Sequence, residues 1–393
     1  MGKDVGHRID RSRRHRCDGA ASLVVAVSLV FLAGLSALAV DYAYLHHRKA
    51  ALHKAAEAGA LAGAAMLVRC GRDMAAVRDA TVKAAQKVLR GEDSPSLAVR
   101  DSDVEFLKNG VPDAAAPDQV QVTAGRTDDR GNPVRLFLGG LLGQRHVEVS
   151  ALARAGLSCS EASEDLFPMI LPAGYFFDDG CDAEPGSSGD GILNAASSCE
   201  MVSVLVSGYG ERDVGRRMVL FPGRIGEVSP AGWYPVMGDA RESRDAGHAP
   251  SGKARMGYRA ALGDRVTLGG MADKTFLCGQ ARQRMDEDPD AFWDDAVLAV
   301  RGSRRQNPED SPRLARVAFF DPSRPPAPGR LEAHICQFGA VFIEEVFADG
   351  RVGVRLARAL AAGPHRAAAP CDPGGVGLYG VGLEPVSGNG EAD

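Results

Sequence analysis

The chain has 393 residues, of which 45% are hydrophobic and 25% are charged, and its formal net charge is -5. This length leaves room for two or three domains, and the mildly acidic balance excludes the basic footprint of a nucleic-acid-binding protein. Gly (47) and Pro (22) are plentiful, whereas aromatic residues make up only 6% of the chain. We therefore expect many turns and modest aromatic cores.

Residues 20–40 form an uncharged apolar run that starts at Ala20 and ends at Val40. A helix of this length spans roughly 31 Å, which matches a hydrocarbon core of about 30 Å. The run therefore predicts a single-pass transmembrane anchor in contact with membrane lipid. It follows a basic segment that contains Lys3, Arg8, Arg11, Arg13, Arg14 and Arg16. The positive-inside rule then favours a cytoplasmic N-terminus and an extracytoplasmic location for residues 41–393.

Two other interpretations of the run stay open. Ala37 and Ala39 form a small-x-small cleavage site, so a signal peptidase would release a secreted protein after Ala39. The run is longer than the apolar region of about 7–15 residues in a usual signal peptide, which favours a retained anchor. The third interpretation is a buried core helix of a soluble protein.

The segment after the run, residues 41–69, contains no Pro, and its apolar and small residues recur at three- and four-residue steps. This periodicity predicts that the transmembrane helix continues outward as one rod. Ala55, Gly59 and Gly63 form a row of small residues, which inside a membrane is typical of a helix-dimer face. Because the row lies roughly 30 Å beyond the apolar run, we expect it to let a helix or a sheet approach closely. A homo-oligomer through this face is an open alternative.

The predicted fold class is α+β, with the long outer helix packed on a small antiparallel sheet, as in pilins, followed by a β-rich α+β domain. The predicted parts are a basic cytoplasmic tail (1–18), the transmembrane helix (19–40), a helix-plus-sheet extracytoplasmic domain (41–156), a β-rich extracytoplasmic domain (157–362) and an irregular Gly- and Pro-rich tail (363–393).

Local patterns predict the elements of both extracytoplasmic domains. Further helices are expected at residues 73–90, 136–142, 253–262 and 289–300. Strands are expected at residues 97–99, 104–106, 120–123, 147–153, 201–206, 217–220, 315–320 and 340–347. For the helix at 289–300, Asp288 is expected to be the N-cap and Pro289 the first helical residue.

Eight cysteines are scattered along the chain and none forms a C-x-x-C pair, which disfavours a zinc ribbon or a thioredoxin-type site. Outside the cytosol such cysteines favour disulfides. Cys181–Cys199 is the preferred bridge because it closes a short loop between strand signals, and Cys278–Cys336 is the next. The chain lacks a nucleophile elbow and a P-loop, so we predict no catalytic residues, no cofactor and no metal site.

The N-terminal third resembles the TadE/TadG-like family of Flp (tight adherence, Tad) pilus-assembly proteins. The residues that carry the resemblance are Gly19-Ala20-Ala21, Ala39-Val40-Asp41-Tyr42, Arg48, Leu52 and the alanine-rich segment from Ala55 to Ala64. This chain departs from the family pattern at four places: Tyr42-Ala43 stands where a Gly is usual, His53 replaces Gln, Glu57 replaces Asp, and Gly59 replaces Ala.

The resemblance implies a non-catalytic component of a Tad-type pilus-assembly or adhesion system in the bacterial cytoplasmic membrane. Its implied partners are other pilus-assembly proteins or pseudopilins. The alternative function is a membrane-tethered extracytoplasmic enzyme or ligand-binding protein, which would need a convergent polar pocket in residues 157–360.

Overall fold

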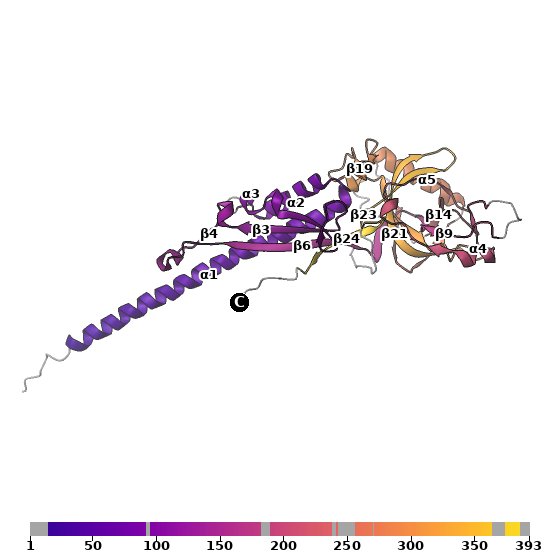
Figure 1. Ribbon diagram of the computed structural model, residues 1–393. Helices are drawn as coiled ribbons and strands as arrows, with labels where there is room; N and C mark the ends of the chain where they lie inside the picture. The colour runs from indigo at the N-terminus through magenta and orange to yellow at the C-terminus, as the bar shows by residue number, and fades with distance from the viewer. Residues whose placement is uncertain are drawn as a thin grey trace, which may run out of the picture.

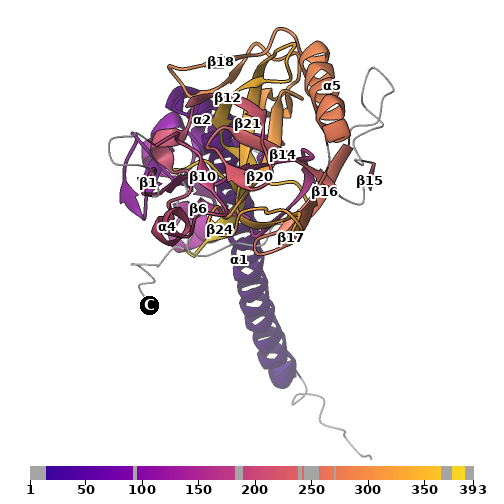
Figure 2. The ribbon, with the colours of Figure 1, turned by 90° about the vertical axis from the view of Figure 1, so that its right-hand side faces the viewer.

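A computed structural model describes residues 15–91, 95–181, 189–237, 241–242, 256–269, 271–363 and 374–385. A long helix, α1 (His15–Arg69), projects from two lobes (Figure 1). The proximal lobe contains the outer half of α1 and a six-stranded sheet, and the distal lobe contains a seven-stranded sheet. Figure 2 shows the distal lobe from its outer end, with α1 running away behind it. The fold class is therefore α+β.

Helix α1 confirms the prediction of one continuous rod. Its 55 residues contain no Pro, and its outer half is rich in Ala, the residue with the highest helix propensity. The helix ends at Arg69, and Gly71 follows with φ +58°. That left-handed conformation favours Gly and is typical of a helix C-terminus.

The proximal lobe packs α1 and α2 (Met74–Val88) against one face of its sheet. The carboxylate of Asp73 accepts the N–H of Ala76 at 3.0 Å and caps α2. A short helix, α3 (Pro95–Ala98), follows. The sheet has the order β2-β1-β3-β6-β24-β23. Its strands are β1 (Val104–Lys108), β2 (Val111–Pro112), β3 (Gln119–Arg126), β6 (Val149–Cys159), β23 (Ala359–Leu360) and β24 (Leu378–Glu384).

A small hairpin, here called the exit hairpin (residues 134–147), extends from this lobe back along α1 (Figure 1). It consists of β4 (Val134–Arg135) and β5 (His146–Val147), which pair antiparallel, with a 3₁₀ turn at Gly139–Leu142 between them. The sequence predicted a helix over 136–142, and only the last part of that segment is helical.

The distal lobe is built on a sheet of order β12-β22-β21-β17-β14-β8-β20, and extra pairings β12–β14 and β21–β20 close it on itself. Aromatic side chains are buried on both of its faces: Tyr234 and Phe342 belong to one hydrophobic cluster, and Trp233 belongs to another on the opposite face. Its strands are β8 (Met169–Pro172), β12 (Arg217–Pro222), β14 (Gly232–Met237), β17 (Arg265–Leu268), β20 (Leu314–Phe320), β21 (Glu332–Val346) and β22 (Val352–Ala357).

Smaller elements cover this closed sheet. Helix α5 (Met271–Glu287) packs on the sheet through Leu277 and Ala281, and helix α4 (Ser198–Ser203) lies beside the short strand β10 (Leu193–Asn194). The short strands are β7 (Ala162–Leu166), β9 (Tyr175–Phe176), β10 (Leu193–Asn194), β11 (Leu205–Val206), β13 (Glu227–Val228), β15 (Arg241–Glu242), β16 (Met256–Ala261), β18 (Phe292–Asp294) and β19 (Ala299–Arg301).

Four predicted elements are wrong. Residues 97–99 belong to a helical turn and not to a strand. Of the strand predicted at 201–206, residues 201–203 are helical, as the end of α4, and only residues 205–206 form a strand, β11. The helix predicted at 253–262 is strand β16 over its described part, in which Tyr258 and Ala260 are buried and Arg259 between them is exposed. This two-residue period is that of a strand.

The helix predicted after Asp288 is also wrong, because the helix lies on the other side of the proline. Helix α5 ends at Glu287, and residues 292–301 form the hairpin β18–β19. A residue that precedes proline is pushed out of the helical region, so Asp288-Pro289 ends a helix here. Asp288 accepts hydrogen bonds from Ser303 Oγ (2.6 Å) and Arg304 N (2.9 Å) instead.

The prediction of an irregular tail is wrong for residues 378–384, which form β24. This strand pairs antiparallel with β6 from Tyr379↔Cys159 to Glu384↔Arg154. The end of the chain thus returns to the sheet of the proximal lobe, and β6 itself continues through the boundary predicted at residue 156. The division of the chain into domains stays a prediction.

Candidate functional site

The inner half of α1 exposes apolar side chains around its whole circumference. Leu23, Phe31 and Leu32 are each more than half exposed, and the most apolar 18-residue window of the helix is 0% buried. The hydroxyl of Ser36, a polar group within this segment, donates to the carbonyl oxygen of Leu32 at 2.8 Å. A helix that is apolar on all sides belongs in a protein core or in a membrane. Since this segment touches no core, α1 is the described helix that is long and apolar enough to span a membrane.

The outer half of α1 presents its small residues to its own lobe. A Cβ added to Gly59 would lie 3.0 Å from Cβ of Ala85 in α2. One added to Gly63 would lie 2.5 Å from Thr81 Oγ1 in α2 and 2.9 Å from a Val120 methyl group in β3. Ala55, in the same row, is fully buried. The row therefore contacts a helix and a sheet of the same chain, and we do not propose a homo-oligomer through it.

Asp41, the first residue after the apolar run, joins α1 to the exit hairpin. Its Oδ1 accepts the N–H of Phe137 at 2.8 Å, and its Oδ2 accepts those of Leu138 (3.0 Å) and Gly139 (2.8 Å). The residue is only 5% exposed. One turn further along α1, the ring of Tyr44 packs edge to face on Phe137 with 5.0 Å between centroids. The hairpin is thus held on the helix at the level where the apolar run ends.

The electrostatics of this contact favour a charged Asp41. Desolvation raises the pKa of its carboxyl group, but the three backbone N–H donors oppose this effect and the pKa lies below its ordinary value. Three donors on one carboxylate are a charge-assisted cap. Sequence reasoning placed Asp41 at the end of the run without this role. The available signal was a carboxylate directly beside a long apolar segment.

The outer end of α1 is attached to the distal lobe by ion pairs. Arg69 Nε lies 2.6 Å from Glu309 Oε1, and Arg301 Nη2 lies 2.6 Å from Asp73 Oδ2. The side chain of Glu309 is almost buried, and this desolvation raises its pKa although Arg69 acts in the opposite direction. The N–H of Arg72 also donates to the carbonyl oxygen of Val297 at 2.8 Å. The rod is therefore connected to both lobes.

These features lie in and next to a segment of the chain that matches a known protein family. Residues 19–66 match the family described as "Putative Flp pilus-assembly TadE/G-like". This TadE/G-like segment contains the whole apolar run, Asp41 and the small-residue row. Its last residues pack in the core of the proximal lobe. No curated protein and no solved structure matches the chain.

Beyond the TadE/G-like segment, one predicted disulfide is present and one is wrong. Cys181 and Cys199 are joined, with 6.1 Å between their Cα atoms. Cys278 and Cys336 are both free thiols. The thiol of Cys278, on α5, donates to the carbonyl oxygen of Gly350, whereas that of Cys336, on β21, donates to Phe319. The sulfur of Cys278 thus faces the turn between β21 and β22, whereas that of Cys336 faces strand β20. Cys159 is also disulfide-bonded.

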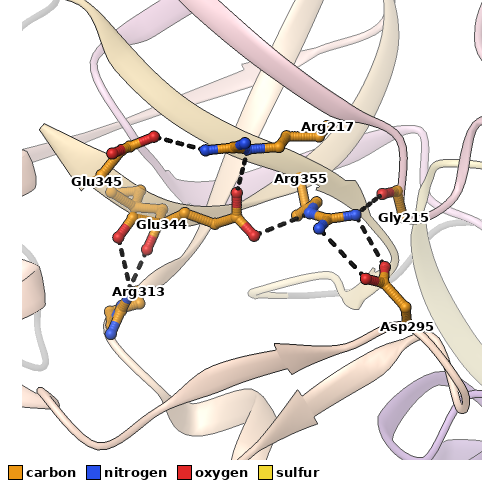
Figure 3. A network of polar contacts seen from close by, with 8 residues as sticks. Gly215, Arg217, Asp295, Arg313, Glu344, Glu345 and Arg355 are labelled. Atoms are coloured by element: carbon orange, nitrogen blue, oxygen red, sulfur yellow. Dashed lines mark hydrogen bonds and ion pairs between the residues drawn. The ribbon is translucent and has the colours of Figure 1, made fainter.

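A network of charged residues in the distal lobe is drawn in Figure 3. Glu344 pairs with Arg217 (2.9 Å) and Arg355 (2.8 Å), and Arg355 also pairs with Asp295 at 2.8 Å. Buried Arg313 donates to the backbone carbonyl oxygens of Ile343 (2.9 Å) and Glu344 (3.0 Å). Each carboxylate in this network meets an arginine, and Arg313 meets carbonyl oxygens. These contacts link strands of the distal lobe to the neighbouring loops.

No described group of three or more His, Cys, Asp or Glu side chains is placed to hold a metal ion. Asp288, in the acidic run of residues 286–290, is bonded to Ser303 and Arg304.

Proposed function

We propose that the chain is a non-catalytic, single-pass membrane component of a Tad/Flp-type pilus-assembly or adhesion system. The observation that carries this proposal is the TadE/G-like match, which coincides with an apolar helix exposed on all sides. The long helix emerges from lipid and then packs on an antiparallel sheet, and this resembles the arrangement of a pilin. The chain would act through helix packing and through contacts outside the membrane with other pilus-assembly proteins or pseudopilins.

The proposed location is the bacterial cytoplasmic membrane, with the N-terminus in the cytoplasm and both lobes outside. The basic residues before the run support this orientation. The Cys181–Cys199 bridge and the bonded Cys159 support it independently, because disulfides persist in oxidising compartments. Cleavage after Ala39 stays the alternative prediction. Mass measurement of the mature N-terminus decides between the two.

The outer end of the distal lobe offers a surface for the proposed protein contacts. Phe176 (67% exposed), Leu205 (65%) and Val202 (88%) come from β9, β11 and α4, and Leu205 pairs with Phe176 across the two strands. The Cys181–Cys199 bridge holds α4 beside this patch. Helix α4 and strand β9 lie at the end of the molecule opposite to the exposed part of α1 (Figure 1). Clustered exposed apolar side chains mark interaction sites more often than single ones do.

Topology is tested with paired C-terminal fusions of the full chain to alkaline phosphatase and to a cytoplasmic fluorescent reporter. We expect phosphatase activity and no reporter fluorescence, and the reverse result would contradict the proposal. Leu32→Arg places a charge in the middle of the run, at a cost of about 3 kcal/mol for insertion. It should abolish the phosphatase signal, whereas Leu32→Ile should not.

The pilus role is tested by deleting the gene in its host. Loss of pili in electron micrographs and loss of surface adhesion are expected, together with restoration by the full chain but not by Leu32→Arg. Complementation with Val202→Asp, which should fail to restore pili, tests the distal patch. Arg259→Asp, at an exposed position of β16 in the same lobe, is its control for added acidic charge and should restore them. Normal pili in the deletion strain would remove the proposed role.

A further inference from the structure

The exit hairpin exposes apolar side chains at the level where α1 leaves its apolar run. Phe137 is 68% exposed and Leu138 is 38% exposed, although both are held to Asp41 by their backbone N–H groups. By contrast, Val134 at the base of the hairpin is buried. The fold thus fixes the backbone of this segment firmly while leaving its apolar side chains uncovered.

Helix geometry places this contact at the edge of a bilayer. The apolar run of α1 has about the length of the hydrocarbon core, and Asp41 is the next residue. Whatever is bonded to Asp41 therefore lies at the boundary between acyl chains and headgroups. Val40, the last residue of the apolar run and the neighbour of Asp41, is itself half exposed.

The chemistry of the hairpin suits that boundary. Tyr42 is largely exposed and Tyr44 packs on Phe137, so aromatic rings gather at one level, as in the aromatic belts of membrane proteins. Arg135 and Arg145 flank the apolar turn and are exposed, which allows them to meet anionic headgroups. Asp41 satisfies three N–H groups of the turn, and unsatisfied backbone groups are costly beside lipid.

From these observations we infer that the exit hairpin is a membrane-interface element: Phe137 and Leu138 insert into the outer leaflet at the headgroup boundary, and Asp41 is the residue that positions them. This inference rests on the membrane anchor of the proposed function. The hairpin and α1 would then contact the bilayer at two places, which would restrict the tilt of the rod and hence the direction in which the distal lobe is presented.

The test measures quenching of Trp fluorescence by lipid. The full-length variant Phe137→Trp is reconstituted into vesicles of phosphatidylethanolamine and phosphatidylglycerol that contain phosphatidylcholine brominated near the carbonyl end of its acyl chains. The two native Trp residues, Trp233 and Trp293, lie in the distal lobe and form a constant background. We expect the introduced Trp to be quenched by the bromine, blue-shifted in emission and protected from a water-soluble quencher.

Two matched variants separate failure of the inference from failure of the anchor. Leu32→Trp, in the middle of the run, should be quenched by deeply brominated lipid, and Phe176→Trp, on the distal lobe, should not be quenched by either lipid. If Leu32→Trp is quenched and Phe137→Trp is not, the hairpin inference is wrong while the anchor stands. If neither is quenched, the anchor itself is wrong.

If a protein surface covers the hairpin in place of lipid, the fluorescence of Phe137→Trp responds differently. Protection of Phe137→Trp from the aqueous quencher without lipid quenching, and with a dependence on the protein-to-lipid ratio, would indicate a second copy and overturn the inference. Adding Asp41→Asn to Phe137→Trp tests the positioning role. Lipid quenching should fall in this double variant while that of Asp41→Asn with Leu32→Trp is unchanged. Equal quenching with and without Asp41→Asn would contradict the role given to Asp41.

Discussion

The carboxylate of Asp41 accepts the backbone N–H of Gly139 at 2.8 Å, although the two residues are 98 positions apart in the chain. This contact joins the end of the apolar run to a hairpin that would otherwise extend freely from the proximal lobe. Gly suits position 139, because a Cβ there would collide with the side chain of Leu136 and the carbonyl oxygen of Gln144. The carboxylate and the tight turn together determine where the apolar side chains of the hairpin lie.

Replacing Asp41 with Asn should loosen the exit hairpin without disturbing the rod. An amide has one acceptor oxygen in place of two and carries no charge, so it cannot hold three N–H groups as the carboxylate does. Hydrogen–deuterium exchange of the reconstituted full chain should show faster exchange in residues 137–139 and unchanged exchange in α2. Equal exchange of the hairpin in both proteins would contradict the role of the cap.

The same contact should depend on pH in a definite direction. Desolvation and three N–H donors act in opposite senses on the pKa of Asp41, and the result lies below the ordinary value of 3.8. A lowered folded-state pKa stabilises the folded form above the ordinary value, and this stabilisation is lost as the pH falls through the lowered pKa. In detergent micelles the emission of Phe137→Trp should therefore shift to longer wavelength only below about pH 3.8.

Other acidic side chains lie near the hairpin. Asp128 and Glu148 lie at its base, where the N–H of Asp128 donates to Glu148 and its carboxylate faces His146. The double variant Asp41→Asn with Phe137→Trp isolates the effect. If its emission shows the same acidic transition, the transition does not come from Asp41.

Gly63→Ala should destabilise the proximal lobe even though Ala favours a helix by about 1 kcal/mol. The added methyl group would lie 2.5 Å from Thr81 Oγ1 and 2.9 Å from a Val120 methyl group, so α2 or β3 must shift. Overpacking of this kind costs about 1–3 kcal/mol. Chemical denaturation in micelles, followed by circular dichroism, measures the free energy of unfolding.

Gly34→Ala is the matched control for this substitution. No heavy atom lies within 4 Å of a Cβ built at Gly34, in the exposed half of the same helix. It should leave the free energy of unfolding unchanged or raise it by up to about 1 kcal/mol. If Gly63→Ala were as stable as the wild type, close packing would not be the reason for Gly at position 63.

The rod and its attachments could be predicted from sequence to different degrees. The helix over residues 19–69 follows from the absence of Pro, and its end follows from Cys70-Gly71, because these signals are local. Its start at His15, within the predicted tail, did not follow from the sequence. The alternation at residues 104–106 and 120–123 likewise identifies two strands of the proximal sheet. Close packing of the small-residue row was also expected, although the pattern alone could not tell a partner helix from α2 and β3 of the same lobe.

What could not be predicted depends on contacts between distant parts of the chain. Asp288-Pro289 is compatible with the start of a helix and with its end, and only the packing of α5 on the closed sheet decides. The segment 378–384 has a Gly-rich composition that suggests a loop, yet pairing with β6 makes it a strand. Asp41 and residues 137–139 carry no shared pattern, because a cap formed across the fold leaves no periodic signal.

Arg313→Lys should destabilise the distal lobe by about 3 kcal/mol. The buried guanidinium group donates from three nitrogen atoms to carbonyl oxygens of Ile343, Glu344 and Ala291. An ammonium group cannot reproduce this fork, so buried carbonyl oxygens would lose their donors. Arg217→Lys is the control, because Arg217 is half exposed and its ion pairs are worth about 1 kcal/mol or less. Equal losses of unfolding free energy in the two variants would contradict the structural role of Arg313.

The Cys181–Cys199 bridge should stabilise the end of the distal lobe that carries the exposed apolar patch. The bridge closes a loop with a sequence separation of 18, and constraining such a loop in the unfolded chain is worth about 3 kcal/mol. The double variant Cys181→Ser with Cys199→Ser should therefore unfold at lower denaturant concentration. The pair Cys278→Ser with Cys336→Ser removes two free thiols and should change the midpoint much less.

Mass spectrometry after alkylation without reductant should label Cys278 and Cys336 in the denatured wild type and leave Cys181 and Cys199 unlabelled. Labelling of all four would show that the bridge does not form, and labelling of none would restore the Cys278–Cys336 pairing.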